Sequence, residues 1–134
     1  MATVTAEIKL TSAAGDLVTD ALSLADSTTI TVTDMATTGL ARTKVVATAV
    51  HSSATVLYTA SDFAAPAYLY VKNTDATPGD YIFVYDATTT GDPVILKLAG
   101  GDWAFLPLNA GLTLKAYATT NPTLIEWMVF GTDA

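Results

Sequence analysis

The sequence contains no cysteine, and this absence excludes several kinds of site at once. Without thiols there is no disulfide framework, no thiolate nucleophile and no cysteine-based zinc centre. Histidine is almost as scarce, because His51 is the single imidazole in 134 residues. One imidazole has no second to join it, so a histidine-based metal site is also excluded.

Charged side chains are few as well. They make up 14% of the residues, whereas soluble domains average about 25%, and hydrophobic residues make up 51%. Six basic residues stand against 13 acidic ones, and the lysines are scattered singly. A nucleic-acid interface needs a clustered basic surface, so we predict no nucleic-acid partner. The low charge favours a chain that buries apolar surface against other subunits, and the alternative is a monomer with a neutral, threonine-rich surface.

Long apolar runs are missing too. No stretch approaches the roughly 18 uninterrupted apolar residues of a membrane span, so we predict no membrane partner. Residues 1–10 carry neither the basic start nor the continuous apolar run of a secretory signal. We therefore expect the chain to be made in soluble form in the cytoplasm of the cell that produces it.

No segment carries a sustained helical period of apolar residues. Short turn signals instead separate runs that are rich in β-branched and aromatic residues, which is typical of antiparallel sheets. The alternation predicts strands over residues 3–10, 28–33, 43–49, 67–72, 81–85, 94–98, 103–108, 112–118 and 123–130. Residues 17–25 are compatible with a strand or with a short helical turn, and both alternatives stay open.

Eight or nine strands with connections of variable length predict an all-β fold. We expect residues 1–134 to form a single-domain antiparallel β-sandwich that is jelly-roll-like. An immunoglobulin-like sandwich is the alternative, although the cysteine pair found in many such domains is missing. Residues 1–10 alternate between apolar and polar side chains, so we expect a half-buried strand there that serves as an N-terminal arm or an edge strand.

One strand pairing is predicted in detail. Residues 67–72 and 81–85 each place aromatic side chains on one face, and the segment 73–80 between them is rich in turn formers. We therefore expect these two strands to pair as a hairpin. Its aromatic face would carry Tyr68, Tyr70, Tyr81, Phe83 and Tyr85.

Residues suited to catalysis are few and poorly arranged. His51 is followed by Ser52 and Ser53, but adjacent side chains point apart and no nucleophile-elbow motif is present. Glu7 and Glu126 are the only glutamates, and nothing in the sequence brings them together as a glycosidase pair. We predict that the protein has no catalytic residues and no cofactor and is not an enzyme.

Four aspartates lie in two predicted loops, Asp75 with Asp80 and Asp86 with Asp92. Carboxylates in loops can bind calcium, but this spacing matches no calcium-binding loop. Aspartate is common in turns, because its side chain accepts hydrogen bonds from the nearby backbone. We therefore predict a role in turns and no metal site.

The strand predicted over residues 123–130 is apolar on both faces apart from Glu126. One face carries Ile125, Trp127 and Val129. Such a strand either lies centrally between two layers or packs one face against a neighbouring subunit. The candidate interface residues are Leu124, Met128 and Phe130 from this strand, with Arg42 and Lys44 from the mixed strand in the first half of the chain.

Three segments carry a resemblance: Tyr68-Leu-Tyr-Val-Lys-Asn-Thr74, Gly101-Asp-Trp-Ala-Phe-Leu-Pro-Leu108 and Glu126-Trp-Met-Val-Phe-Gly131. They are similar to small head or tail structural proteins of tailed bacteriophages, and most of all to capsid decoration (cement) proteins. The resemblance covers residues 67–131 and consists of strand and turn segments without a catalytic signature.

This resemblance implies a jelly-roll-like virion protein on the capsid surface. It implies a homo-oligomer, often a trimer, whose partners are the major capsid protein or other virion proteins, and which stabilises the shell without chemistry. A receptor- or carbohydrate-binding module of a phage tail or fibre is the alternative function. In that module Tyr81, Phe83 and Tyr85 would act as stacking surfaces.

Overall fold

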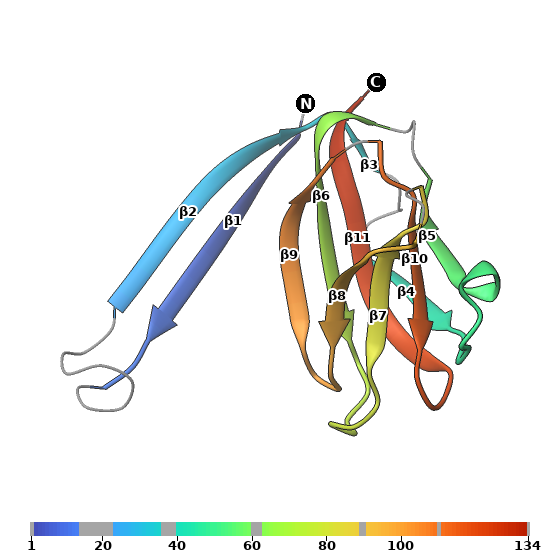
Figure 1. Ribbon diagram of the computed structural model, residues 1–134. Helices are drawn as coiled ribbons and strands as arrows, with labels where there is room; N and C mark the ends of the chain where they lie inside the picture. Colours follow the sequence, from blue (N-terminus) through green and yellow to red (C-terminus); the bar gives the residue numbers. More distant parts are fainter. Residues whose placement is uncertain are drawn as a thin grey trace. The chain divides into compact units, whose positions relative to one another are not determined.

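The computed structural model describes residues 2–13, 23–35, 40–59, 63–88, 91–109 and 111–133. These residues lie almost entirely in antiparallel strands and the turns between them, so the predicted all-β class is confirmed (Figure 1). Contacts group the chain into two compact units, Met1–Thr33 and Asp34–Ala134. The two units are defined by their contacts, which do not show whether each unit folds by itself. The single domain over residues 1–134 therefore stays a prediction.

The first unit contains a long hairpin. Its strands β1 (Ala2–Thr11) and β2 (Ser23–Val32) pair antiparallel from end to end, with Ala2 opposite Val32 and Thr11 opposite Ser23. Alternate residues share a face, so one face is apolar apart from Asp26 and Thr28. That face carries Val4, Ala6, Ile8 and Leu10 from β1 and Leu24, Ile30 and Val32 from β2.

The strand predicted over residues 3–10 is confirmed, but its burial is not. Ile8 is 48% exposed and Leu10 is 52% exposed, while Leu24 on β2 is 47% exposed. The expected half-buried strand is therefore largely solvent-facing toward its C-terminal end. The reason is that the alternation shows which residues share a face and does not show whether another layer covers that face.

The second unit contains two antiparallel sheets and a short 3-10 turn, η1 (His51–Ser53). The first sheet consists of β3 (Asp34–Met35), β4 (Ala41–Val45), β11 (Thr123–Asp133), β6 (Phe63–Asn73) and β9 (Trp103–Leu108). The second sheet consists of β5 (Thr55–Tyr58), β10 (Leu114–Ala118), β7 (Ile82–Asp86) and β8 (Val94–Leu98).

The strand order is that of a jelly roll. From β4 onward the strands pair as nested partners: β4 with β11, β5 with β10, β6 with β9 and β7 with β8. Successive pairs alternate between the two sheets, as if one long double strand were wrapped around the core. This nesting confirms the predicted sandwich and favours the jelly roll over the immunoglobulin-like alternative, in which the strands are distributed differently between the sheets.

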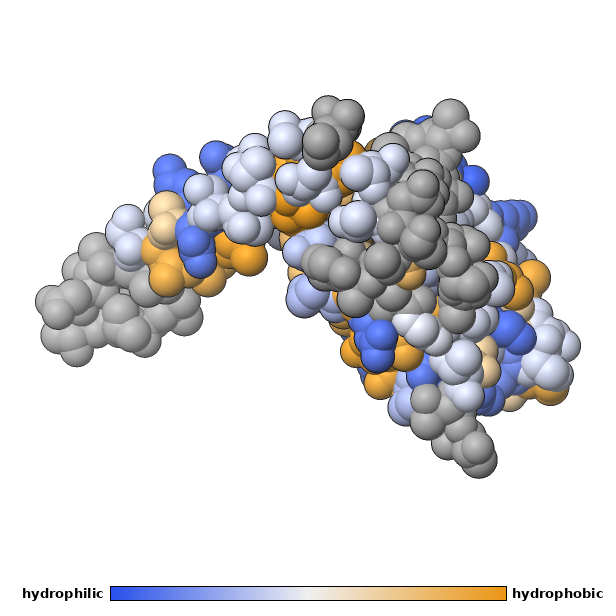
Figure 2. Space-filling model, turned by 90° about the horizontal axis from the view of Figure 1, so that it is seen from above, coloured by the Kyte–Doolittle hydropathy of each residue, from blue (hydrophilic) through white to orange (hydrophobic). Residues whose placement is uncertain are grey.

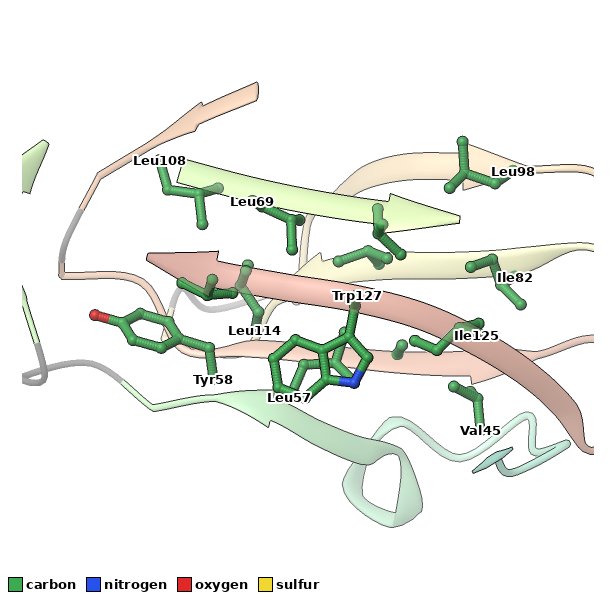
Figure 3. Close-up of a cluster of buried hydrophobic side chains, with 14 of the residues drawn as sticks. Val45, Leu57, Tyr58, Leu69, Ile82, Leu98, Leu108, Leu114, Ile125 and Trp127 are labelled. Atoms are coloured by element: carbon green, nitrogen blue, oxygen red, sulfur yellow. The ribbon is translucent and has the colours of Figure 1, made fainter. Parts of the chain in front are cut away.

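The core lies between the two sheets (Figure 3). Every second residue of β11 points into it, and Ile125 and Val129 are completely buried there. Trp127 is also buried, and its indole N–H donates a hydrogen bond to the Thr43 hydroxyl at 2.8 Å. This bond satisfies the polar end of an otherwise apolar side chain.

The predicted hairpin of residues 67–72 with 81–85 is wrong. β6 pairs with β11 and β9 in the first sheet, whereas β7 pairs with β10 and β8 in the second. Residues 74–81 therefore cross from one sheet to the other. β3 and β5 were not predicted, because one has only two residues and the other has four.

Asn73 holds the start of the segment that crosses between the two sheets through hydrogen bonds of its side chain. Its side chain is fully buried and donates to the carbonyls of Asp80 at 2.9 Å and Leu98 at 3.2 Å, and its oxygen accepts from the N–H of Asp75. The β8–β9 turn lies close by, and a Cβ added to Gly100 would clash with the Thr77 backbone. A buried amide thus ties two loops together at one end of the sandwich.

Candidate functional site

Four of the five candidate interface residues lie at the surface of one sheet. Lys44 is opposite Leu124 and Arg42 is opposite Glu126 across the β4–β11 pair, and opposite residues in such a pair share a face. The intervening residues of β11 point into the core, so this face is the outer one. Leu124 is 45% exposed, Arg42 and Lys44 are exposed, and Met128 is half-buried.

Arg42 is oriented on this face by an ion pair. Its Nε donates to Oε1 of Glu126 at 2.9 Å and its Nη2 donates to the same oxygen at 2.6 Å. The Arg42 side chain is nevertheless 68% exposed, while that of Glu126 is 17% exposed. Such a solvent-facing pair stabilises the fold by about 0 to 1 kcal/mol, so its main effect is to hold the guanidinium in place.

Phe130 differs from the other candidates, because it is completely buried. Its ring stacks with those of Tyr68 at 5.8 Å and Phe105 at 6.2 Å between centroids. Tyr68 and Phe105 also stack on each other at 5.9 Å. The aromatic side chains of three neighbouring strands thus pack together on the outer face, which leaves Phe130 unavailable to a partner in this structure.

The same face carries an exposed tryptophan that the sequence reasoning did not single out. Trp103 on β9 is opposite Lys72 on β6, which is in turn opposite Glu126 on β11. Its side chain is 59% exposed. The alternation of β9 was the available signal, because Ala104 and Leu106 face inward between Trp103 and Pro107. A strand pattern alone does not show which face of the sheet is exposed to solvent.

The second sheet carries a different cluster on its outer face, around the single histidine. The ring of His51 lies 4.9 Å from that of Tyr85 and 5.1 Å from that of Tyr117, and its Nδ1 is 3.2 Å from Oδ2 of Asp92. Tyr117 also stacks on Phe83 at 5.1 Å. His51 is thus packed among aromatic rings, with no serine hydroxyl recorded as its hydrogen-bond partner among the described residues.

Tyr85 is the buried member of this cluster. Its side chain is 1% exposed, and its hydroxyl donates to the carbonyl oxygen of His51 at 2.6 Å. Burial raises the pKa of Tyr85 above its ordinary value of 10.0, and the negative charge of Asp92 and the nearby Tyr117 add to this effect. Tyr85 therefore cannot serve as the exposed stacking surface that was considered for it.

The two other aromatic residues of that predicted surface are half-buried. The Lys97 ammonium lies 4.1 Å from the ring centroid of Tyr81 and 5.6 Å from that of Phe83. Cation–π contacts of this kind stabilise surface aromatic rings. The lysine thus covers part of the surface at which a sugar would have to stack.

Two of the four loop aspartates, Asp75 and Asp86, form turn hydrogen bonds, whereas the Asp92 side chain contacts His51. Oδ1 of Asp75 accepts a hydrogen bond from the N–H of Thr77, and Oδ1 of Asp86 accepts from both the N–H and the hydroxyl of Thr88. Bonds to the backbone two residues further on are typical of aspartate in turns. Within the described ranges, no group of three or more metal-binding side chains comes together.

The hairpin is the third candidate surface. Its described side chains are nearly all exposed from residue 7 onward on β1 and up to residue 29 on β2. Figure 2 shows apolar atoms at the surface of the hairpin strands, between polar ones. Exposed apolar patches of this kind often mark interaction sites in other proteins.

Two of the groups considered for chemistry have other contacts in the described part of the structure. Glu126 is engaged with Arg42, and the imidazole of His51 is packed against aromatic rings. In the part of the chain that the structure describes, no helix is long and apolar enough to span a membrane.

Comparisons with protein-family models, with curated proteins and with solved structures each found no match.

Proposed function

We propose that this protein is a non-enzymatic structural component of a virus particle, of the capsid decoration (cement) type. The observation that carries the proposal is the amphipathic hairpin β1–β2, with Ile8, Leu10 and Leu24 about half-exposed. Viral capsid proteins are among the proteins that use a jelly roll, which fits the strand order of the second unit.

The proposed mechanism is attachment through many weak apolar contacts. Ile8, Leu10 and Leu24 share one face of the hairpin, and burying such side chains against another protein is favourable by about 25 cal/mol for each Å² of apolar surface. A shell presents the same site many times, so modest single contacts suffice when several linked copies bind together. The proposed partner is the major capsid protein or another virion protein, and copies of the chain would also associate with one another.

The low charge of the chain supports the same mechanism. Only 14% of the residues are charged, and ionic contacts are the ones that salt screens. Binding to a shell should therefore depend only weakly on salt concentration. A strong loss of binding between low and physiological ionic strength would point instead to an electrostatic interface.

The test uses undecorated capsids and two matched leucine variants. Full-length protein should sediment with capsids at a fixed ratio and raise the temperature or force at which they break, because a ligand that binds only the intact shell stabilises it. Leu10→Asp on the hairpin should abolish binding, whereas Leu124→Asp on β11, at a leucine of similar exposure, should leave it unchanged. If only Leu124→Asp abolishes binding, the β4–β11 face makes the contact.

A carbohydrate-binding role is the second candidate, and Trp103 favours it. Its side chain is 59% exposed and lies in a cross-strand row with Lys72 and Glu126, so a ring for stacking stands near groups that can hydrogen-bond. A glycan array separates the two functions. Specific glycan binding that is lost in Trp103→Ala, without any capsid binding, would replace the cement proposal with a tail or fibre module.

A further inference from the structure

The free edge of β1 is the feature that carries an additional inference. No other described strand besides β2 pairs with β1, so the backbone groups along its outer edge have no partner within the described chain. We propose that this edge pairs antiparallel with the β1 edge of a second copy of the chain, about a two-fold axis at Ile8. This contact does not depend on the presence of a capsid.

The sequence of β1 is complementary to itself in that register. Pairing about Ile8 places Glu7 of each copy opposite Lys9 of the other, so two opposite-charge pairs form on one face. The same register places Leu10 opposite Ala6 on the apolar face and Thr5 opposite Thr11 on the polar face. Glu7 and Lys9 are the only charged residues of β1, and each thus meets its opposite.

The register also keeps the two faces of the hairpin continuous. Ile8 and Leu10 lie on the apolar face with Leu24 of β2, while Glu7 and Lys9 lie on the other face. An antiparallel pair about a residue joins like faces, because residues at equal distances from the axis point to the same side. A sheet of four strands results, with the two β1 strands at its centre.

The other edge of the hairpin does not offer this complementarity. Asp26 is the only charged residue of β2, so pairing of β2 with itself gives no opposite-charge pair in any register. The other polar residues of β2 are serines and threonines, which carry no charge. Charge complementarity therefore selects β1 as the edge that pairs with its own copy.

The edges of the sandwich carry features that discourage such pairing. Pro107 lies in the edge strand β9, β5 has only four residues, and the register of β8 shifts opposite Val84 and Tyr85. Proline, short length and bulges are the means by which proteins prevent edge-to-edge association. By contrast, β1 has ten residues and no proline, and its one lysine, Lys9, meets Glu7 of the other copy in the proposed register.

The pairing would also stabilise the hairpin itself. A two-stranded hairpin with an exposed apolar face is marginal in water, and three or more strands are usually needed for stability. Joining two hairpins doubles the number of strands and gives one wider apolar face that carries Ile8, Leu10 and Leu24 from both copies. In the proposed function that wider face is the surface offered to the shell.

Charge exchange tests the register directly. In Glu7→Lys both charged positions of β1 are basic, and in Lys9→Glu both are acidic, so each variant repels its own copy. Each should dimerise about tenfold more weakly than the unchanged protein, because two favourable pairs become two unfavourable ones. The two variants mixed in equal amounts should recover dimerisation, as should the double variant Glu7→Lys/Lys9→Glu.

Cross-linking provides a second measurement, which does not depend on the small energies of the charge pairs. The chain has no cysteine, so a single introduced thiol can link only to the same position of another copy. Ile8→Cys should form a disulfide-linked dimer under mild oxidation, because residues facing each other across an antiparallel pair lie within the Cα separation that a disulfide requires. Leu24→Cys, on β2 and away from the axis, is the matched control and should stay unlinked.

The expected result is a mass of two chains by light scattering, each 13.9 kDa, with efficient linking at residue 8 only. Equal linking in Leu24→Cys, or no recovery in the mixed charge variants, would overturn the two-fold contact at Ile8. A mass of three chains would favour the trimer implied by the resemblance instead. These measurements contain no capsid, so their failure is distinct from a failure of shell binding.

Discussion

The hairpin and the sandwich have similar strands but bury them very differently. In the sandwich, Leu69 and Val71 on β6 are completely buried between two sheets. In the hairpin, Ile8 and Leu10 lie on an equally regular apolar face and are about half-exposed. The sandwich therefore contains the closed core on which stability depends, whereas the hairpin presents exposed apolar side chains, which we propose serve association.

The largest expected difference comes from the same substitution in the two regions. Leu69→Ala should reduce the free energy of unfolding by about 2 to 5 kcal/mol, because it leaves a cavity in a closed core. Leu10→Ala should change it by less than about 0.5 kcal/mol, since its side chain is 52% exposed. Denaturant unfolding measures both, and equal losses would show that the hairpin is part of the stability core.

A smaller loss is expected at the crossover between the sheets. Asn73→Ala should destabilise the protein by about 1 to 3 kcal/mol, because buried carbonyls of Asp80 and Leu98 lose their donor. Asn109→Ala is the matched control, since the Asn109 side chain is exposed and accepts a hydrogen bond from the N–H of Gly111. A thermal melt in which both variants behave alike would contradict the structural role of Asn73.

Because of Tyr85, the stability of the sandwich should decrease at alkaline pH. The folded state holds its proton to higher pH than the unfolded state, because burial raises the pKa of Tyr85 above 10.0. This contribution is complete below about pH 10 and is lost as pH rises from there through the pKa of the folded state.

The corresponding variant is Tyr85→Phe, with Tyr70→Phe on the other sheet as its control. Tyr85→Phe should cost about 1 kcal/mol at neutral pH, through loss of the hydrogen bond to the His51 carbonyl, and should reduce the alkaline decline. Unfolding measured between pH 7 and 11 follows both effects. A decline that is the same in all three proteins would assign it to other groups.

The smallest effect is expected at the surface ion pair of the β4–β11 face. Arg42→Ala should cost less than about 1 kcal/mol, and the cost should shrink further in high salt. Lys44→Ala is the control, since Lys44 lies opposite Leu124 rather than a carboxylate. A loss above 2 kcal/mol at Arg42 alone would show that the pair is more than a surface contact.

The sequence predicted the class of the fold and most of the strands, because alternation is a local signal. It also placed Ile125, Trp127 and Val129 on one face of β11, and the structure shows that this face points into the core. It did not predict the partner of each strand, since β7 and β8 pair with each other while β6 and β7, although consecutive, lie in opposite sheets. The turn-rich segment 73–80 therefore indicated a hairpin where the chain instead crosses between the sheets.

The candidate interface was predictable only in part, for the same reason. Alternation placed Leu124, Met128 and Phe130 on one face, and the register confirms this arrangement. It could not show that rings from two other strands stack on Phe130. Exposure depends on tertiary packing, so the exposure of Trp103 and of the hairpin residues Ile8, Leu10 and Leu24 emerged only from the structure. Their role at an interface stays a prediction.

Hydrogen exchange of β1 and β6, measured together, tests most directly whether the hairpin is the element of association. In dilute protein the amides of β6 should be strongly protected and those along the free edge of β1 weakly protected, because local stability follows burial. Raising the protein concentration, or adding undecorated capsids, should then increase protection in β1 and leave β6 unchanged. Strong protection of β1 in dilute protein, or no change on association, would contradict the account.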